Sequence, residues 1–116
     1  MKKRDEIYRL ASIVKYFDVN FISNEDCNKI ADLDGNFSDG ASCAIRLLVV
    51  DGFSRYLPHV RVELINLLKK CLADEKEDFS RLFSEIEMAF QTEVENKRHF
   101  MQVLLKELEP YAVPEK

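Results

Sequence analysis

The sequence predicts an all-α protein, a bundle of four or five helices with a long helix near the C-terminus. Three observations predict this fold: apolar residues recur every three or four positions along most of the chain, no stretch sustains the alternation of a strand, and only 3 Gly and 3 Pro are available for turns. A chain of 116 residues can bury a core without disulfides or a structural metal. We expect one domain over residues 1–116, with a frayed tail at about 111–116.

Two helices are expected in the first third of the chain. The first spans residues 4–17, where apolar side chains repeat at helical spacing. Its predicted core positions are Ile7, Leu10, Ala11, Val14 and Phe17. The second is short and begins after Ser23, whose hydroxyl can accept the backbone N–H of Asp26, three residues further on. It should run through Cys27 and Ile30.

A third helix is expected at residues 41–50, an apolar run that suits the centre of the bundle. Ser38 or Asp39 should cap its start, because short polar side chains accept the first backbone N–H groups of a helix. Asp51 and Gly52 should end it, since glycine adopts the left-handed cap conformation at little cost.

The second half of the chain predicts one helix and then a longer helical region. Residues 58–73 begin with proline, which the first turn tolerates, and then keep helical spacing. The charged run DEKED at 74–78 interrupts this pattern. Helical periodicity then extends over residues 79–108, as one helix or as two with a bend near Asn96, until Pro110 ends it.

The stretch DLDGNFSDG, which begins at Asp32, gathers enough oxygen ligands to raise the question of a calcium loop. An EF-hand loop needs oxygen ligands at positions 1, 3 and 5, glycine at 6 and glutamate at 12. Counted from Asp32, the last two positions hold Phe37 and Cys43, and the frame that starts at Asp34 fails as well. We therefore predict no metal site and no cofactor, and we expect a turn at each of the two Asp-Gly pairs.

No catalytic site is predicted, because the chain has no phosphate-binding glycine loop, no HExxH and no nucleophile elbow. Cys27, Cys43 and Cys71 include no CxxC pair, which indicates half-buried, reduced thiols of a cytosolic protein. His59 and His99 lie forty residues apart. Glu95 lies four residues before His99, so the two side chains can share a helix face, and this spacing favours a solvated ion pair over a metal site.

Charge is segregated along the chain. Residues 18–39 carry six acids and one base, and residues 74–109 carry ten acids and five bases, so each segment has a net charge of −5. The whole chain is −4 with a pI of about 5.2, the wrong sign for gripping nucleic acid. Exposed carboxylates can instead steer a basic partner protein. The predicted partner-binding acids are Glu25, Asp26, Asp32, Asp34 and Asp39, and in the second segment Asp74, Glu75, Glu77 and Asp78.

The segment GFSRYLPH adds a second kind of candidate. Phe53 and Tyr56 flank Arg55 in a connection between helices, and exposed aromatic and arginine side chains commonly anchor partners. The alternative is that both rings turn into the core. Phenylalanines that follow the apolar stripe of the last third are predicted core residues: Phe79, Phe83 and Phe90.

The acidic segment EDCNKIADLDGNFSDGASCAIRLL, in a short helical chain with reduced thiols and no catalytic motif, resembles the small helical immunity proteins that bacteria make against secreted toxins, including those of contact-dependent inhibition. The resemblance implies a non-enzymatic inhibitor that binds a basic toxin domain, such as a nuclease, with carboxylates standing in for phosphates. Two alternatives remain: a helical adaptor that self-associates through its long C-terminal helix, and a small enzyme with a composite site around His59, His99 and acids.

The location of the protein is predicted from its N-terminus and its longest apolar runs. MKKR could begin a signal peptide, but Asp5, Glu6 and Arg9 interrupt what should be the apolar region. No run approaches the roughly 18 apolar residues of a membrane span. We therefore expect a cytoplasmic protein with no membrane partner.

Overall fold

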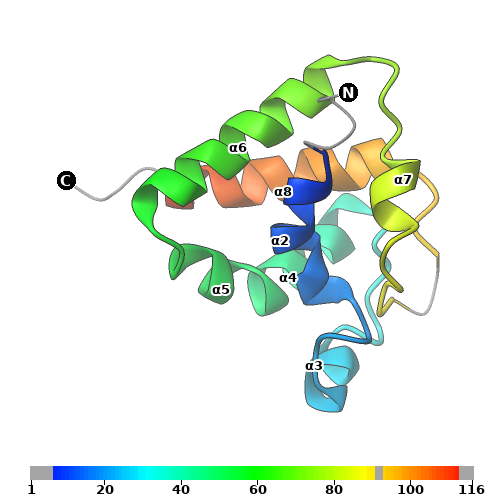
Figure 1. The fold of residues 1–116 in the computed structure, drawn as a ribbon. Coiled ribbons are helices and arrows are strands. Elements are labelled where there is room, and N and C mark those ends of the chain that lie inside the picture. The colour runs from blue at the N-terminus through cyan, green and yellow to red at the C-terminus, as the bar shows by residue number, and fades with distance from the viewer. Residues whose placement is uncertain (1–6, 91–92, 113–116) are drawn as a thin grey trace.

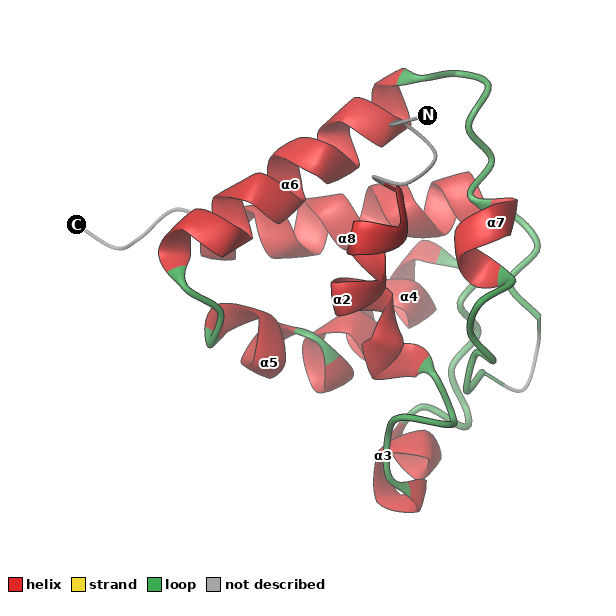
Figure 2. Ribbon diagram, in the orientation of Figure 1, coloured by secondary structure: helices red, strands yellow, loops and turns green. Residues whose placement is uncertain are grey.

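The computed structural model describes residues 7–90 and 93–112. The elements run in the order η1 Tyr8–Leu10, α2 Ala11–Val14, η2 Lys15–Phe17, α3 Asn24–Lys29, α4 Ser38–Leu48, α5 Val50–Ser54, α6 Pro58–Ala73, α7 Ser80–Phe83 and α8 Lys97–Ala112 (Figures 1 and 2). The predicted all-α fold with a long C-terminal helix is confirmed. In the described residues, extended pairing is limited to one isolated antiparallel bridge between Asp18 and Met88.

Helix α8 occupies the centre of the bundle. It packs most extensively against α6, then against α4 and α5, so that α6 lies on one side of it and α4 with α5 on the other (Figure 1). The short α2 crosses in front of these layers, and α3 projects from the body at the lower edge of Figure 1. The central place therefore belongs to α8, and the prediction that the apolar α4 would hold it is wrong.

The apolar side of α8 forms the middle of the core. Its buried residues are Phe100, Met101, Val103, Leu104, Leu108 and Ala112. The ring centroid of Phe100 lies 5.3 Å from that of Phe17, 6.0 Å from that of Phe83 and 5.8 Å from that of Phe90, all near-perpendicular. We call these four residues the aromatic cluster. Phe79 is fully buried as well, so the prediction that the phenylalanines of the apolar stripe are core residues is confirmed.

The first predicted helix is a chain of short turns. Its first three residues lie outside the described part, and the rest divides into the 3₁₀ turns η1 and η2 with α2 between them. The predicted core positions are buried except for Ala11, which is half-buried, and Ile13 is buried in addition. Ile13 lies in α2, three residues after Leu10, and residues three apart share one face of a helix.

Two local predictions are confirmed at helix starts. The Ser23 hydroxyl accepts the backbone N–H of Asp26 at 3.1 Å, which caps α3 as expected. Helix α6 begins at Pro58 and ends at Ala73, as the sequence pattern predicts. Both helix starts depend on residues within one helical turn of each other, so no tertiary contact is needed to specify them.

The prediction of helix throughout residues 79–108 is wrong. Phe79 adopts a left-handed conformation (φ 66°), α7 is a single turn, and the described residues 84–90 and 93–96 form no regular helix. A new helix, α8, begins just after Asn96, whose side-chain oxygen accepts the backbone N–H of His99 at 3.0 Å. The bend predicted near Asn96 therefore marks a capped helix start.

Backbone pairing with a distant segment explains why the chain leaves the helical path after α7. The Val19 N–H donates to the Glu87 carbonyl at 2.9 Å, and the Ala89 N–H donates to the Phe17 carbonyl at 2.8 Å. These bonds satisfy polar groups that a helix would otherwise satisfy. The apolar spacing survives because the same side chains enter the core from an extended path.

The start of α4 also differs from prediction. Its N-cap is Phe37, and no side chain caps it, because Ser38 and Asp39 already belong to the helix. The Ser38 Oγ instead lies 3.0 Å from His99 Nε2. The second Asp-Gly pair, which includes Gly40, is therefore helical and not a turn.

The expected stop at Asp51 and Gly52 is wrong too, since both lie inside α5. Gly52 has no positive φ; its role is steric. A Cβ at this position would collide with the hydroxyl end of Tyr16, so glycine allows the Tyr16 ring to lie against α5.

Pro110 lies inside α8 and does not end it. The Arg61 Nη1 donates to the carbonyl of Tyr111 at 3.0 Å, and Ala112 is buried, so tertiary contacts hold the turn around the proline. The predicted frayed tail thus does not begin at residue 111. Residues 113–116 lie outside the described part of the chain.

Replacing Gly40 with alanine is expected to lower the free energy of unfolding by about 1–3 kcal/mol. In most helices this change stabilises by up to about 1 kcal/mol, but here the added Cβ would collide with the backbone carbonyl oxygen of Asp34. Urea unfolding measures the difference. Asp39→Ala, at the exposed neighbouring position, is the control and should cost about 1 kcal/mol or less. A more stable Gly40→Ala variant would contradict the packing described.

Candidate functional site: a groove between α3 and α5

A groove of about 530 Å³ lies where the end of η2 and the following loop meet α3, α4 and α5. We call it the α3–α5 groove. Its lining residues are Tyr16, Phe21, Ile22, Ser23, Asp26, Lys29, Leu47, Leu48, Asp51, Gly52, Arg55 and Tyr56. The lining combines aromatic and aliphatic side chains with two acids and two bases, a composition that suits contact with another protein.

Two tyrosines form a rigid wall of the groove. The Tyr56 hydroxyl donates to the Ser12 carbonyl at 2.8 Å, and the Tyr16 hydroxyl lies 3.3 Å from the Tyr56 oxygen, which leaves Tyr16 as the donor in that contact. Burial, followed by the hydrogen bond to Tyr56, raises the pKa of Tyr16 to about 12. The Tyr16 hydroxyl therefore keeps its proton at neutral pH and acts here as a hydrogen-bond donor.

Two apolar side chains stand out from the groove into solvent. Phe21 is 54% exposed and Leu47 is 47% exposed. The Phe21 ring lies edge-on to Tyr16, with centroids 5.9 Å apart, and the Lys15 ammonium sits 4.9 Å from the Phe21 centroid. These contacts restrain Phe21 without burying it. Both side chains have apolar area left to bury against a partner.

The charged groups of the groove are arranged as two ion pairs. Lys29 Nζ lies 3.2 Å from Asp26 Oδ1, and Arg55 Nη2 lies 3.1 Å from Asp51 Oδ2. Both pairs are solvent-accessible and lie within one helical turn, so each contributes little to stability. A partner that supplies its own charges can therefore replace either pairing at small cost.

The structure brings together residues that the sequence analysis assigned to separate candidates. Asp26 of the first acidic segment lines the same groove as Arg55 and Tyr56 of GFSRYLPH. Phe53 does not join them: it is fully buried, with its ring 6.2 Å from that of Tyr56, so it cannot serve as an exposed anchor. The alternative that both rings turn into the core holds fully for Phe53, whereas Tyr56 is half-buried against the core.

The other acids of the first segment lie outside the groove lining. Asp34 is half-buried, and its carboxylate accepts the backbone N–H of Asn36 at 2.9 Å. The Asn36 side chain in turn donates to the Glu93 carbonyl at 2.8 Å and accepts the Glu95 N–H at 2.7 Å. Through these Asn36 hydrogen bonds, the segment DLDGNFSDG holds the backbone just before α8. The exposed acids of this segment are Glu25, Asp32 and Asp39.

The second predicted acidic face is largely a set of turns. Its carboxylates accept backbone N–H groups two residues ahead: Asp74 from Lys76 at 3.1 Å, Glu77 from Phe79 at 2.8 Å and Asp78 from Ser80 at 2.9 Å. The bond from Ser80 lowers the pKa of Asp78 below its ordinary value. Glu75 is exposed. This segment therefore shapes the α6–α7 connection more than it offers a docking face.

Arg98 organises that connection, a role that sequence reasoning missed. Its guanidinium donates to three carbonyl oxygens, those of Leu72 at 2.8 Å, Asp74 at 3.0 Å and Glu77 at 2.9 Å. The first two belong to the end of α6, where helix carbonyls lack partners. Within ENKRH, Arg98 looks like one more solvated charge, because its acceptors are more than twenty residues away.

The two histidines do not form a shared site. His59 lies in the first turn of α6 and His99 in the first turn of α8, and these turns stand at opposite ends of the bundle in Figure 1. His99 meets Ser38 instead, a pairing across 61 residues that local patterns cannot show. In residues 7–90 and 93–112 no group of three His, Cys, Asp or Glu is placed to hold a metal. Cys71 is buried, and Cys27 and Cys43 are half-buried.

The outer side of α8 bears on the adaptor alternative. The apolar stripe of α8 is buried in the core. The outer side of the helix has a shallow depression, which is lined by Gln102, Leu105, Lys106, Glu109 and Pro110. Leu105 is half-buried there. The depression therefore joins two apolar residues, Leu105 and Pro110, with three polar or charged ones.

No family model matches the chain, and neither the curated proteins nor the solved structures contain a significant match. Within the described residues, none of the helices has both the length and the apolar character needed to cross a bilayer.

Proposed function

We propose that this chain is a non-catalytic, protein-binding inhibitor, and that it acts as an immunity protein in the cytoplasm by neutralising a basic toxin domain through one-to-one binding. The observation that carries the proposal is the α3–α5 groove. There, exposed Phe21 and Leu47 stand beside Asp26 and Asp51, whose present ion-pair partners are solvent-accessible.

The groove can supply both affinity and selectivity. Burying a large apolar side chain contributes about 1.5–3 kcal/mol, so the exposed parts of Phe21 and Leu47 are its main source of binding energy. Asp26 and Asp51 can exchange Lys29 and Arg55 for cations of the toxin. Exposed acids around α3 add a negative field that raises the encounter rate with a basic domain.

This arrangement favours the inhibitor over the adaptor alternative. A self-associating adaptor needs an apolar stripe on its long helix, and the stripe of α8 is buried against α6, α4 and α5. The two functions also differ in solution: an inhibitor forms a complex with one other chain, whereas an adaptor forms a homo-oligomer. Light scattering of the purified protein, alone and with partner, separates them.

The first experiment is to recover the tagged chain from its host, identify a bound protein by mass spectrometry, and measure the affinity of the purified pair by calorimetry. We expect Phe21→Ala and Leu47→Ala each to weaken binding by about tenfold or more, because each removes apolar contact area. Leu57→Ala is the matched control for Leu47→Ala: Leu57 is 63% exposed but lies outside the groove, so its replacement should leave affinity unchanged.

A second set of variants tests the charges. Asp26→Lys with Asp51→Lys should weaken binding further and reduce its salt dependence, while Asp32→Lys with Asp39→Lys should mainly slow association. Asp34 is left intact because its carboxylate holds a turn. In cells, the wild-type chain should restore growth when co-expressed with the toxin and the groove variants should not. Full affinity in the groove variants would exclude the groove, and a partner whose activity is unaffected would exclude inhibition.

A further inference from the structure

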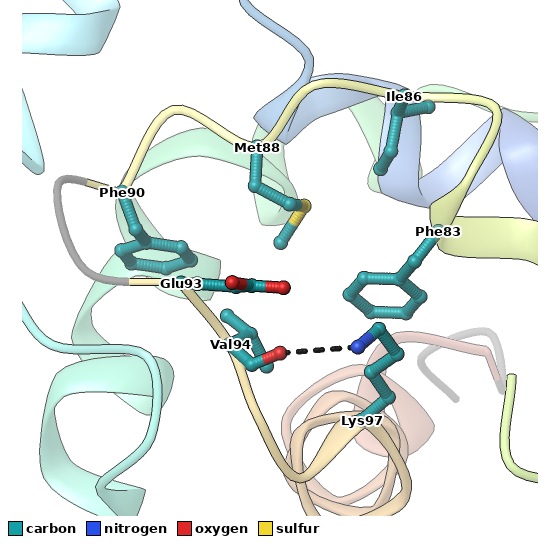
Figure 3. A pocket seen from close by; sticks show the side chains of 7 residues that line it. All are labelled: Phe83, Ile86, Met88, Phe90, Glu93, Val94 and Lys97. Carbon is teal, nitrogen blue, oxygen red and sulfur yellow. Dashed lines mark hydrogen bonds between the residues drawn. The ribbon is translucent and has the colours of Figure 1, made fainter. Parts of the chain in front are cut away.

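We propose that the cavity between α7 and the start of α8 binds a free apolar α-amino acid. The cavity measures about 280 Å³. Among the described residues, five apolar side chains line it, those of Phe83, Ile86, Met88, Phe90 and Val94, together with the charged side chains of Glu93 and Lys97 (Figure 3). This site is separate from the α3–α5 groove, and the proposal needs no partner protein.

The walls of the cavity are held by contacts on their far side. The Phe90 ring stacks on Phe17, with centroids 5.7 Å apart, and both Phe83 and Phe90 pack edge-on against Phe100. Asn36 fixes the backbone of the rim through the Glu93 carbonyl. The surrounding packing therefore supports an open cavity before any ligand enters.

Its size points to a small occupant. The cavity of about 280 Å³ is partly open to solvent, so a ligand can enter it from the surface. It is slightly smaller than the sites that take drug-sized ligands, which begin at about 300 Å³. A single apolar side chain fits this space better than a peptide or a nucleotide.

The charges at the cavity select the head group of the ligand. The Lys97 ammonium donates to the Val94 carbonyl at 3.3 Å and lies 5.8 Å from the centroid of Phe83. An ammonium has three N–H donors, so Lys97 can hold a carboxylate beside that carbonyl, and its place in the first turn of α8 also favours an anion. The Glu93 carboxylate reaches toward the middle of the space in Figure 3, where it can accept from an ammonium.

Opposite charges above an apolar floor match a zwitterion with an apolar side chain. A simple fatty acid could pair with Lys97 but would leave the Glu93 carboxylate unpaired and repelled by its own, and a simple amine could pair with Glu93 but would leave Lys97 unpaired. An apolar amino acid satisfies both groups and fills the cavity with its side chain. Phenylalanine, methionine and leucine are the members of this class to test.

The test is a titration of the full chain with L-phenylalanine, followed by calorimetry and by amide chemical shifts in NMR spectra. We expect saturable binding. Phenylpropionate, which lacks the ammonium, and phenethylamine, which lacks the carboxylate, should each bind about tenfold more weakly or worse, because each leaves one charge of the site unpaired. Lys97→Met and Glu93→Gln should each produce a loss of the same size for L-phenylalanine.

Lys106→Met and Glu85→Gln, exposed positions outside the cavity lining, are the matched controls and should leave the affinity unchanged. Circular dichroism checks that each variant is folded. If Lys97→Met is unfolded, the affinity of Glu93→Gln tests the proposal instead. Glu93→Gln should fold, because the residue is exposed and its backbone contact to Asn36 is kept. The proposal is overturned if none of the three amino acids binds at millimolar concentration. It is also overturned if either analogue binds as well as phenylalanine, or if the cavity variants bind as the controls do.

Discussion

Phe100→Ala is expected to lower the free energy of unfolding by about 3–5 kcal/mol, the usual cost of truncating a fully buried phenylalanine. Phe100 is fully buried and contacts Phe17, Phe83 and Phe90, each from a different segment of the chain. Its removal therefore leaves a cavity bounded by η2, α7 and α8, and the edge-on ring contacts with three partners are lost together.

Urea unfolding followed by circular dichroism measures this effect. Phe21→Ala makes the same chemical change at a 54% exposed position and should cost about 1 kcal/mol or less. Domains of this size have about 5–15 kcal/mol of total stability, so Phe100→Ala can leave too little for folding. In that case Phe100→Leu, expected to cost about 1–2 kcal/mol, is compared with Phe21→Ala instead. Equal losses at Phe100 and Phe21 would mean that the aromatic cluster is not the centre of the core.

Arg98→Met is expected to cost about 2–4 kcal/mol, the second-largest effect. The variant removes three charge-assisted hydrogen bonds and leaves the carbonyls of Leu72, Asp74 and Glu77 without this donor at a half-buried place. Arg98→Lys should fall between the wild type and Arg98→Met, because a single ammonium keeps the charge but does not reproduce the forked geometry that reaches all three oxygens.

Hydrogen exchange distinguishes this local role from a general loss of stability. In Arg98→Met, the amides of Lys76, Phe79 and Ser80 should exchange faster than those of the core helices, because their turns depend on the anchored carbonyls. Arg9→Met, at an exposed arginine paired with Glu63, is the control and should cost about 1 kcal/mol or less. A loss in Arg98→Met no larger than that in Arg9→Met would show that these hydrogen bonds do not hold the connection.

The candidate site was only partly predictable from the sequence. Asp26, Arg55 and Tyr56 are all groove residues, but nothing local indicates that the first shares a surface with the other two. Phe21 and Leu47, the exposed apolar residues of the groove, follow no distinctive pattern. Some of the remaining predicted acids are exposed outside the groove. Others are used in turns, because a carboxylate can accept a backbone N–H two residues ahead without any partner protein.

The sequence by itself determined the helical class, the capped start of α3, the limits of α6 and the burial of the phenylalanines in the last third. Each of these depends on side chains within a turn or two of one another, where spacing and capping chemistry act directly. Only the tertiary structure decided the path of residues 84–90 and 93–96, the steric role of Gly52 against Tyr16, and the three carbonyls that accept hydrogen bonds from Arg98. Those features depend on groups far apart in the chain, so their energies exist only once the segments have packed together.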